Sequence, residues 1–500
     1  MRRIKLFFMN AVILTVTSLF ISSVSVVFSV YLSNKIGADG IGLYQLIQSI
    51  YSLAITFAAS GINLAATRLV SEELARGSHQ GAKRAMRSCI LYSLLCGVCT
   101  AAAIFCNAPY IGTVWLQDAR AIKSLYALAC SLPFIAMSAA LSGYFTAVRR
   151  VAKSASAQIF EQLVRMTLMV CALQLLAPSG LEYACLAVVA GGSLSELASF
   201  TYLFLLYLRD KRRYQKKDKQ RHPVTRHMFG IAVPVALSSY LRMGLNTITQ
   251  LMVPAGLKKS GVSGDTVLAQ YGIIRGMVMP VIMFPAAFLN ALAGLIVPEL
   301  SESHACQDRG RINYMASHLI QVTLLFSVGV SGILLAFARP LGMALYNNRD
   351  AALFISLLAP LTIVMYFDTA VDGMLKGLDE QVSSMRYNII DSAVSVVMLY
   401  FLLPKYGIYG YLMVIYASEC LNAFLSINRL LCITDFKIRF IDWTLKPAAG
   451  ILFATWLAKL VAGQTLVLPI LAAIVFYILF LLVTNCITKD NLVLVRSILK

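Results

Sequence analysis

The fold class is decided by residues 6–31, LFFMNAVILTVTSLFISSVSVVFSVY, because this run contains no charged side chain. A helix that crosses a bilayer needs about 20 consecutive apolar residues. The run follows the basic residues Arg2, Arg3 and Lys5, as in a secretion signal. It is longer than the apolar core of such a signal, and no clear cleavage site of small residues ends it. We therefore predict a retained first transmembrane helix.

The composition extends this prediction to the whole chain of 500 residues. Hydrophobic residues make up 59% and charged residues 13%, whereas a soluble domain carries about 25% charged residues. These values exclude a soluble enzyme, a disordered chain and a fibrous protein. We predict an all-α integral membrane protein with about fourteen transmembrane helices. The expected spans are about 8–32, 43–66, 87–107, 122–147, 155–177, 183–208, 229–254, 268–297, 315–338, 351–375, 386–404, 408–430, 444–462 and 466–486.

The net charge of +20 comes from 43 Lys and Arg against 23 Asp and Glu. If the N-terminus is cytoplasmic, the predicted inner segments hold 31 of these cations and the outer loops hold 8. Cytoplasmic loops of membrane proteins collect Lys and Arg. We therefore expect a multi-pass plasma-membrane protein with both termini in the cytoplasm. The positive charge then needs no nucleic-acid partner, and we expect none.

Two features predict the division into domains. A basic polar stretch, residues 209–227, separates the sixth and seventh spans, and residues 44–72 match residues 271–299 at nine of 29 positions without gaps. Both matching spans run in the same direction, so the repeat is parallel. We predict an N-terminal lobe with the basic cytoplasmic linker (1–225), a C-terminal lobe (226–431), and a last segment of two helices and a cytoplasmic tail (432–500). Transporters commonly place their site between such repeats.

Polar side chains recur at steps of three and four residues inside three predicted spans, which places them on one face of each helix. One interpretation is helix–helix packing, in which Ser and Thr are common. The other is the wall of a hydrated cavity, which the amides and the arginine favour. The three sets are Thr15, Ser18, Ser22, Ser25 and Ser29; Gln45, Ser49, Ser52, Thr56, Ser60 and Asn63; and Ser238, Arg242, Asn246 and Gln250.

Arg242 and Arg275 lie well inside predicted spans, and neither has an acidic residue three or four positions away. A charge at the bilayer centre costs about 2.5–3.5 kcal/mol on the insertion scale and is by default a functional hypothesis. The planar guanidinium matches phosphate oxygens. These arginines therefore predict an anionic ligand. The alternative is that each one pairs with a carboxylate on another helix.

Several acids lie in spans as well. Glu161 and Arg165, at positions i and i+4, predict a structural ion pair. Asn388 and Asp391, at i and i+3, offer oxygen ligands for Na⁺ or a proton relay, although acids are also common at a helix N-terminus. Further candidates for ion coupling are Asp368, Asp372, Glu196 and Glu419. No GxxxxGK[ST], HExxH or GxSxG motif occurs, so we expect no enzyme, no catalytic residue and no metal centre.

Three groups of residues resemble a known family. Residues 36–45, IGADGIGLYQ, and residues 60–73 resemble the first outer loop and the second helix of polysaccharide-export flippases. Residues 375–392 and 403–410 look like the stage V sporulation protein B branch of that family. This branch belongs to the multidrug/oligosaccharidyl-lipid/polysaccharide exporter superfamily. The resemblance implies two six-helix lobes in a MATE-like V shape that open alternately to each side, and transport of lipid-linked sugars that carry a pyrophosphate.

The same resemblance suggests a site. Arg275 falls where lipid II flippases carry a cavity arginine in their eighth helix, while the arginines of their first helix are absent here. We predict a flippase for a polyprenyl-pyrophosphate-linked oligosaccharide or a peptidoglycan precursor, in which Arg242 and Arg275 bind the pyrophosphate. The residues expected to contact the sugar or line its path are Gln45, Gln48, Asn63, Asn246, Gln250 and Tyr271.

We expect no cofactor other than Na⁺ or H⁺ as a coupling ion. The expected partners are the lipid-linked sugar, membrane lipids and enzymes of cell-wall or polysaccharide synthesis, with the protein itself a monomer. A role in sporulation, capsule or general cell wall stays open. One alternative is a Na⁺- or H⁺-coupled multidrug or metabolite antiporter of the same superfamily. Another is a membrane-embedded transferase, which the chain disfavours because it lacks a constellation of His and Asp.

Overall fold

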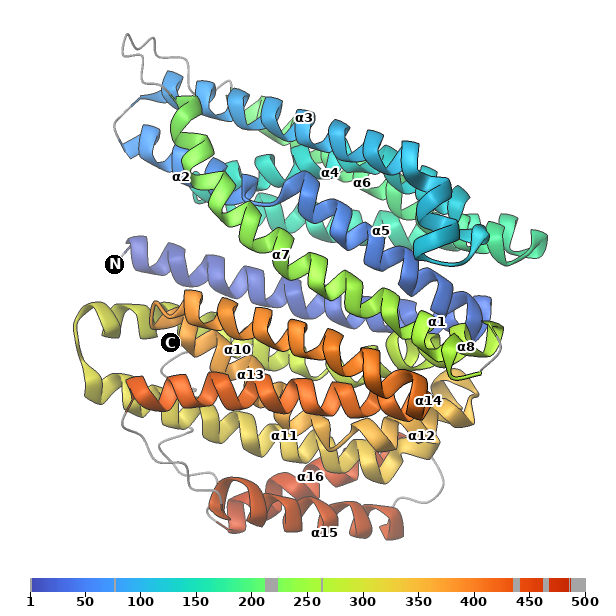
Figure 1. Cartoon of the computed structure of the whole chain (residues 1–500). Coiled ribbons are helices and arrows are strands. Elements are labelled where there is room, and N and C mark those ends of the chain that lie inside the picture. The colour runs from blue at the N-terminus through green and yellow to red at the C-terminus, as the bar shows by residue number, and fades with distance from the viewer. Residues whose placement is uncertain are drawn as a thin grey trace. The chain divides into compact units, whose positions relative to one another are not determined.

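The computed structural model describes residues 2–75, 78–211, 224–261, 264–434, 441–461, 467–484 and 486. Helix is the regular structure throughout these residues, and no strand occurs in them (Figure 1). The prediction of an all-α protein is confirmed. Most of the predicted basic linker (212–223) and of the C-terminal tail (487–500) lies outside the described residues.

The helices follow one another with short connections. They are α1 (Arg2–Ala59), α2 (Ile62–Ala75), α3 (His79–Tyr110), α4 (Ile122–Ala147), α5 (Val151–Leu176), α6 (Leu181–Lys211), α7 (Val224–Lys259), α8 (Gly264–Gly272), α9 (Met279–Met283), α10 (Ala286–Ala305), α11 (Arg309–Tyr346), α12 (Arg349–Leu358), α13 (Leu361–Gly377), α14 (Gln381–Ile433), α15 (Lys446–Val461) and α16 (Val467–Val483). π-Helical segments are η1 (Ile111–Trp115), η4 (Ile273–Val278) and η5 (Ile441–Leu445), and short 3₁₀ turns are η2 (Ala119–Ala121) and η3 (Ala177–Ser179).

Glycine breaks the two longest helices. Gly37 in α1 has φ 75° and Gly407 in α14 has φ 56°, a left-handed region that favours glycine. Each of these helices is therefore two helices joined at a kink. Eight helices of the described chain are long and apolar enough to cross a membrane, or nine if the pair α12 and α13, bent by 56°, counts as one span. The number fourteen stays a prediction.

The chain forms two compact units. Unit 1 comprises residues 1–17 and 36–272, and unit 2 comprises residues 18–35 and 273–500. Helix α7 thus groups with unit 1, while residues 18–35 of α1 group with unit 2. The predicted lobe boundaries at 225 and 431 stay a prediction.

In unit 1, helices α3, α4, α5 and α6 pack side by side, and α2 contacts α3 and α4 (Figure 1). Their interface is apolar and fully buried around Ile62, Met86 and Phe145. Helices α1 and α8 approach closely at Gly42 of α1. A Cβ atom at Gly42 would lie 2.0 Å from the carbonyl oxygen of Leu268, so this crossing admits no side chain at Gly42.

In unit 2, helices α10, α11, α13 and α14 share a core that includes Leu300, Ile320 and Met374. Helices α15 and α16 form a pair that packs on α11 (Figure 1). The Tyr477 hydroxyl on α16 donates a hydrogen bond of 2.7 Å to the Leu325 carbonyl. This bond satisfies the polar end of a side chain that is otherwise buried among apolar residues.

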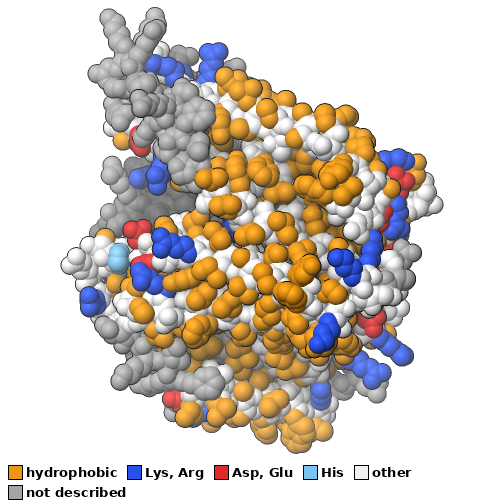
Figure 2. Space-filling model, in the orientation of Figure 1, with side chains coloured by type: hydrophobic (Ala, Val, Ile, Leu, Met, Phe, Trp, Pro, Cys, Tyr) orange, Lys and Arg blue, Asp and Glu red, His pale blue; other side chains and the backbone are white. Residues whose placement is uncertain are grey.

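Large apolar side chains cover much of the visible surface of the molecule (Figure 2). Leu175 is 78% exposed, and Val27, Phe401 and Phe424 are exposed to similar degrees. Soluble proteins rarely expose apolar patches of such extent. The surface therefore suits contact with lipid, and the prediction of a multi-pass membrane protein is confirmed. The orientation of the termini stays a prediction.

Candidate transport site

The eighth predicted span is broken in the middle. Helix α8 passes into the π-helical segment η4, then into the short helix α9 and finally into α10. Pro280 has no amide hydrogen, so the Gly276 carbonyl four residues earlier loses its usual helical partner. Ser29 of α1 donates a hydrogen bond of 2.9 Å to that carbonyl. Single-turn π segments occur frequently at functional sites.

Two tyrosines of unit 2 satisfy further carbonyls in the same break. The Tyr346 hydroxyl donates to the Met277 carbonyl at 2.8 Å, and the Tyr366 hydroxyl donates to the Ile282 carbonyl. The break is thus held by side chains from neighbouring helices. Ser29 acts here in helix–helix packing, one of the two interpretations of the polar face of the first span.

Arg275 lies in η4 and is half-buried. Its Nε atom donates a hydrogen bond of 2.9 Å to the hydroxyl of Tyr411 on α14. Glu419, two turns further along α14, interacts electrostatically with Arg275. The structure therefore places this predicted phosphate ligand at the helix break, within the field of an acidic residue.

Glu419 belongs to a group that we call the unit-2 carboxylate cluster: Asp368 of α13 with Asp391 and Glu419 of α14. Glu419 interacts electrostatically with both aspartates. Asn422 donates a hydrogen bond of 2.8 Å to Asp368, and Ser418 donates one of 2.7 Å to Asp391. Among the described residues, Oδ1 of Asp368 and Oδ1 of Asn422 are buried without a hydrogen-bond partner. Buried oxygen acceptors without a donor are the groups that bind a proton or a hard cation.

Asp372 and Asn388 form their hydrogen bonds with residues outside this cluster. Asp372 pairs with Lys376 at 2.5 Å and accepts a hydrogen bond from Ser384. Asn388 donates to the backbone carbonyl of Ser384 at 2.8 Å. The predicted pair of Asn388 and Asp391 therefore has separate partners.

Unit 1 contains a second group of intramembrane charges, the unit-1 ion cluster of Glu161, Arg165 and Glu196. An NH₂ group of Arg165 lies 2.5 Å from Glu161 and 2.7 Å from Glu196. The predicted pair of Glu161 and Arg165 is present, and Glu196 of α6 joins it. Tyr51 of α1 also contacts Glu196 at 3.4 Å. A cavity of about 40 Å³ beside Arg165 is lined in part by Gln48.

The other predicted ligands are spread over unit 1. Arg242 is exposed on α7 and has no hydrogen bond or ion pair within the described chain. One turn further along, Gln250 donates to Asn246 at 3.3 Å. Asn63 is exposed and donates to the Ala139 carbonyl at 3.2 Å. The roles of these residues as substrate ligands stay predictions.

Two more predicted ligands of unit 1 differ in exposure. Gln45 of α1 is half-buried, whereas Tyr271 of α8 is fully buried. Tyr271 therefore lies below the surface of unit 1, where packing restricts access by a large sugar.

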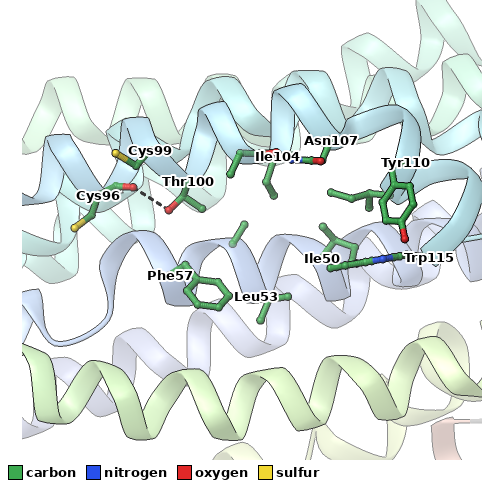
Figure 3. A pocket seen from close by; sticks show the side chains of 13 residues that line it. Ile50, Leu53, Phe57, Cys96, Cys99, Thr100, Ile104, Asn107, Tyr110 and Trp115 are labelled. Atoms are coloured by element: carbon green, nitrogen blue, oxygen red, sulfur yellow. Dashed lines mark hydrogen bonds between the residues drawn. The ribbon is translucent and has the colours of Figure 1, made fainter.

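An apolar groove of about 600 Å³ runs between α1 and α3 in unit 1 (Figure 3). Phe57 and Trp115 lie along its length, and its lining contains no charged side chain. Two of its polar side chains bond within α3: Thr100 donates to the Cys96 carbonyl and Asn107 to the Ala103 carbonyl, each at 2.8 Å. The groove suits a hydrocarbon chain better than a phosphate or a sugar.

Sequence reasoning missed several partners of these charges, among them Tyr51, Tyr411, Ser418 and Asn422. A signal for two of them was present, since Ser418, Asn422 and Ser426 follow one another at steps of four and so share a face of α14. The acid at position 419 marks that region as functional. Tyr51 carried no comparable signal, because a tyrosine in an apolar span is ordinary.

The polysaccharide biosynthesis protein family model matches residues 7–304, which is more than half of the chain. The chain belongs to this family. It is also 26% identical over 481 residues to stage V sporulation protein B of Bacillus subtilis (strain 168), and the match covers 93% of this chain and 92% of that protein. The family that the sequence motifs suggested is therefore confirmed.

Solved structures give the same fold at low sequence identity. A lipid II flippase MurJ in an inward closed conformation matches with a TM-score of 0.67 and 14% identity, over 97% of this chain and 99% of that one. An inward-facing multidrug resistance MATE family transporter matches with a TM-score of 0.65 and 13% identity, over 84% of this chain and 98% of that one. At this level of identity the likeness shows that the chain shares the fold of these two transporters.

Proposed function

We propose that this protein is a flippase that moves a polyprenyl-pyrophosphate-linked oligosaccharide or a lipid II-like peptidoglycan precursor across the plasma membrane by alternating access. The observation that carries the proposal is the extent of the fold match. The lipid II flippase structure covers 97% of this chain, whereas the multidrug transporter covers 84%. The family and the relative support the same function.

Arg275 supplies the chemistry of recognition in this proposal. Its Nε atom is held by Tyr411, so the side chain is oriented while the guanidinium fork carries further donors. Guanidinium donors form paired, charge-assisted hydrogen bonds with phosphate oxygens. The helix break of η4 holds this half-buried cation in unit 2. Arg242, exposed on α7 of unit 1, stays a predicted ligand of the pyrophosphate.

The unit-2 carboxylate cluster supplies ion coupling in the same proposal. Glu419 interacts electrostatically with Asp368 and Asp391, and two buried oxygen atoms, one of Asp368 and one of Asn422, are without donors in the described residues. A Na⁺ ion or a proton at Asp368 would neutralise this repulsion. Binding there is then linked to the η4 break through the electrostatic interaction of Glu419 with Arg275.

The second candidate function is a Na⁺- or H⁺-coupled antiporter for drugs or metabolites. The same carboxylate cluster and the multidrug transporter fold favour it. The intramembrane arginines disfavour it, because they repel cationic substrates. Association with enzymes of cell-wall or polysaccharide synthesis and a monomeric state are further proposals. A role in sporulation is another, which the similarity to stage V sporulation protein B supports.

The test is transport by the purified protein in proteoliposomes. We expect flipping of a polyprenyl-pyrophosphate oligosaccharide by the wild type, its loss in Arg275→Ala, and its retention in the matched control Lys405→Ala, which removes an exposed cation of unit 2. Cation-driven efflux of a drug, with no flipping of the lipid-linked sugar, would overturn the proposal in favour of the antiporter.

A further inference from the structure

A pocket of about 380 Å³ in unit 2 lies between α11 and α12. The two helices touch closely beside it, since a Cβ atom at Gly342 would lie 2.6 Å from the backbone of Ala352. Pro340 lies in the last two turns of α11, beside this contact. The two helices that border the pocket therefore pack backbone to backbone beside it.

The walls of this pocket are apolar, with Leu335 and Met343 from α11 and Leu353 from α12. All three side chains are substantially exposed, at 42%, 38% and 46%. In a membrane protein, such side chains at a pocket mouth contact lipid chains rather than water.

Two arginines form the charged part of the same pocket, Arg339 near the end of α11 and Arg349 at the start of α12, and Ser356 is a further polar lining residue. Both are exposed, and neither has an ion-pair partner in the part of the chain that the structure describes. The described lining residues include no carboxylate. The side-chain oxygen of Asn348 caps α12 by accepting hydrogen bonds from the backbone amides of Asp350 and Ala351. The charged donors of the pocket are the two guanidinium groups.

We propose that this pocket binds an anionic phospholipid, with the phosphate held by Arg339 and Arg349 and one acyl chain along Leu335 and Leu353. Two cations above an apolar wall match the two halves of such a lipid, because guanidinium groups form charge-assisted hydrogen bonds with phosphate oxygens. Arg349 begins the bent pair α12 and α13, and α13 carries Asp368. A lipid at this position would therefore contact the bent helix pair α12 and α13, which contributes Asp368 to the unit-2 carboxylate cluster.

Native mass spectrometry of the delipidated full-length protein tests this proposal, with phosphatidylglycerol as the probe and phosphatidylcholine for comparison. Each basic residue near an anionic lipid surface strengthens binding about fivefold, so the double variant Arg339→Gln, Arg349→Gln should bind phosphatidylglycerol about thirtyfold more weakly. The matched control is the double variant Arg309→Gln, Lys405→Gln. It removes two exposed cations of unit 2 that do not line the pocket, and it should bind like the wild type.

Two further arms separate a lipid from a free phosphate. Leu353→Ser should also weaken the binding of phosphatidylglycerol, because the acyl chain loses an apolar contact. Inorganic pyrophosphate should not displace the bound lipid. Equal binding by the double variant and its control would overturn the proposal, and so would displacement of the lipid by inorganic pyrophosphate. The binding is measured without transport, so its failure leaves the proposed flippase function untouched.

Discussion

The two charge clusters of this molecule differ in how their carboxylates are neutralised. In unit 1, Arg165 contacts both Glu161 and Glu196 directly. In unit 2, Asp368 and Asp391 are held by the neutral donors Asn422 and Ser418. The unit-1 ion cluster carries its own cation. In the unit-2 carboxylate cluster an amide and a hydroxyl hold two of the three acids, and the third, Glu419, interacts electrostatically with Arg275.

This difference indicates which of the two clusters is able to bind a proton or a metal ion from outside the protein. A buried ion pair already has its counter-charge, and removing one member leaves an uncompensated buried charge that costs about 3–5 kcal/mol. A carboxylate that is held only by neutral donors stays available to a proton or a metal ion. We therefore assign a structural role to the unit-1 ion cluster and a coupling role to the unit-2 carboxylate cluster.

The largest expected effect is on the stability of unit 1. Arg165→Gln leaves Glu161 and Glu196 without their cation and should lower the free energy of unfolding by about 3–5 kcal/mol, measured by thermal unfolding in detergent. The triple variant Glu161→Gln, Arg165→Met, Glu196→Gln should recover most of that loss, because it removes all three charges. If Arg165→Gln unfolds at the temperature of the wild type, the structural role is wrong.

Asp368→Asn tests the coupling role of the unit-2 carboxylate cluster. It should leave the unfolding temperature close to that of the wild type, because no cation of the protein depends on this carboxylate in the described residues. Flipping should lose its dependence on the Na⁺ or H⁺ gradient. Glu299→Gln, which removes an exposed acid of the same unit, is the control and should keep that dependence. Gradient dependence that survives in Asp368→Asn would contradict the coupling role.

A smaller effect is expected at the helix break beside Arg275. Ser29→Ala leaves the Gly276 carbonyl without its donor, which should cost about 1–3 kcal/mol if the carbonyl is shielded from water. Ser23→Ala is a matched control, because that hydroxyl donates to the Leu19 carbonyl within the same helix. Equal unfolding temperatures for the two variants would show that the break does not depend on Ser29.

The smallest effect concerns a surface ion pair of unit 2. Arg429 donates to Glu380, at the turn before α14, and this bond lowers the pKa of the Glu380 carboxyl from its ordinary value. A lowered pKa stabilises the fold at pH values above the ordinary pKa of the carboxyl, and this contribution is lost as the pH falls through the lowered pKa of the folded state. Exposed pairs contribute little. At neutral pH the wild type should therefore unfold at a slightly higher temperature than Glu380→Gln, and the difference should disappear at an acidic pH at which this carboxyl is protonated in the folded state as well. A difference that stays constant with pH would exclude this pair as its cause.

The fold class and the family could be predicted from the sequence because both follow from local patterns. Apolar runs of about 20 residues need no tertiary information, and the pair Glu161–Arg165 follows from helical spacing. The partner of Glu196 could not be predicted, because Arg165 lies 31 positions away on another helix. The same holds for Tyr411 beside Arg275, 136 positions apart. Spacing gives the face of a helix, whereas packing decides which faces meet.

The central claim is that Arg275 binds the pyrophosphate of a lipid-linked sugar. The most direct measurement is native mass spectrometry of lipids that co-purify with the full-length protein, in the wild type, in Arg275→Ala and in the control Lys405→Ala. We predict a bound polyprenyl-pyrophosphate sugar in the wild type and in Lys405→Ala, and the loss of this lipid in Arg275→Ala. Equal retention of that lipid in Arg275→Ala would contradict the account, and so would bulk phospholipid alone in all three samples.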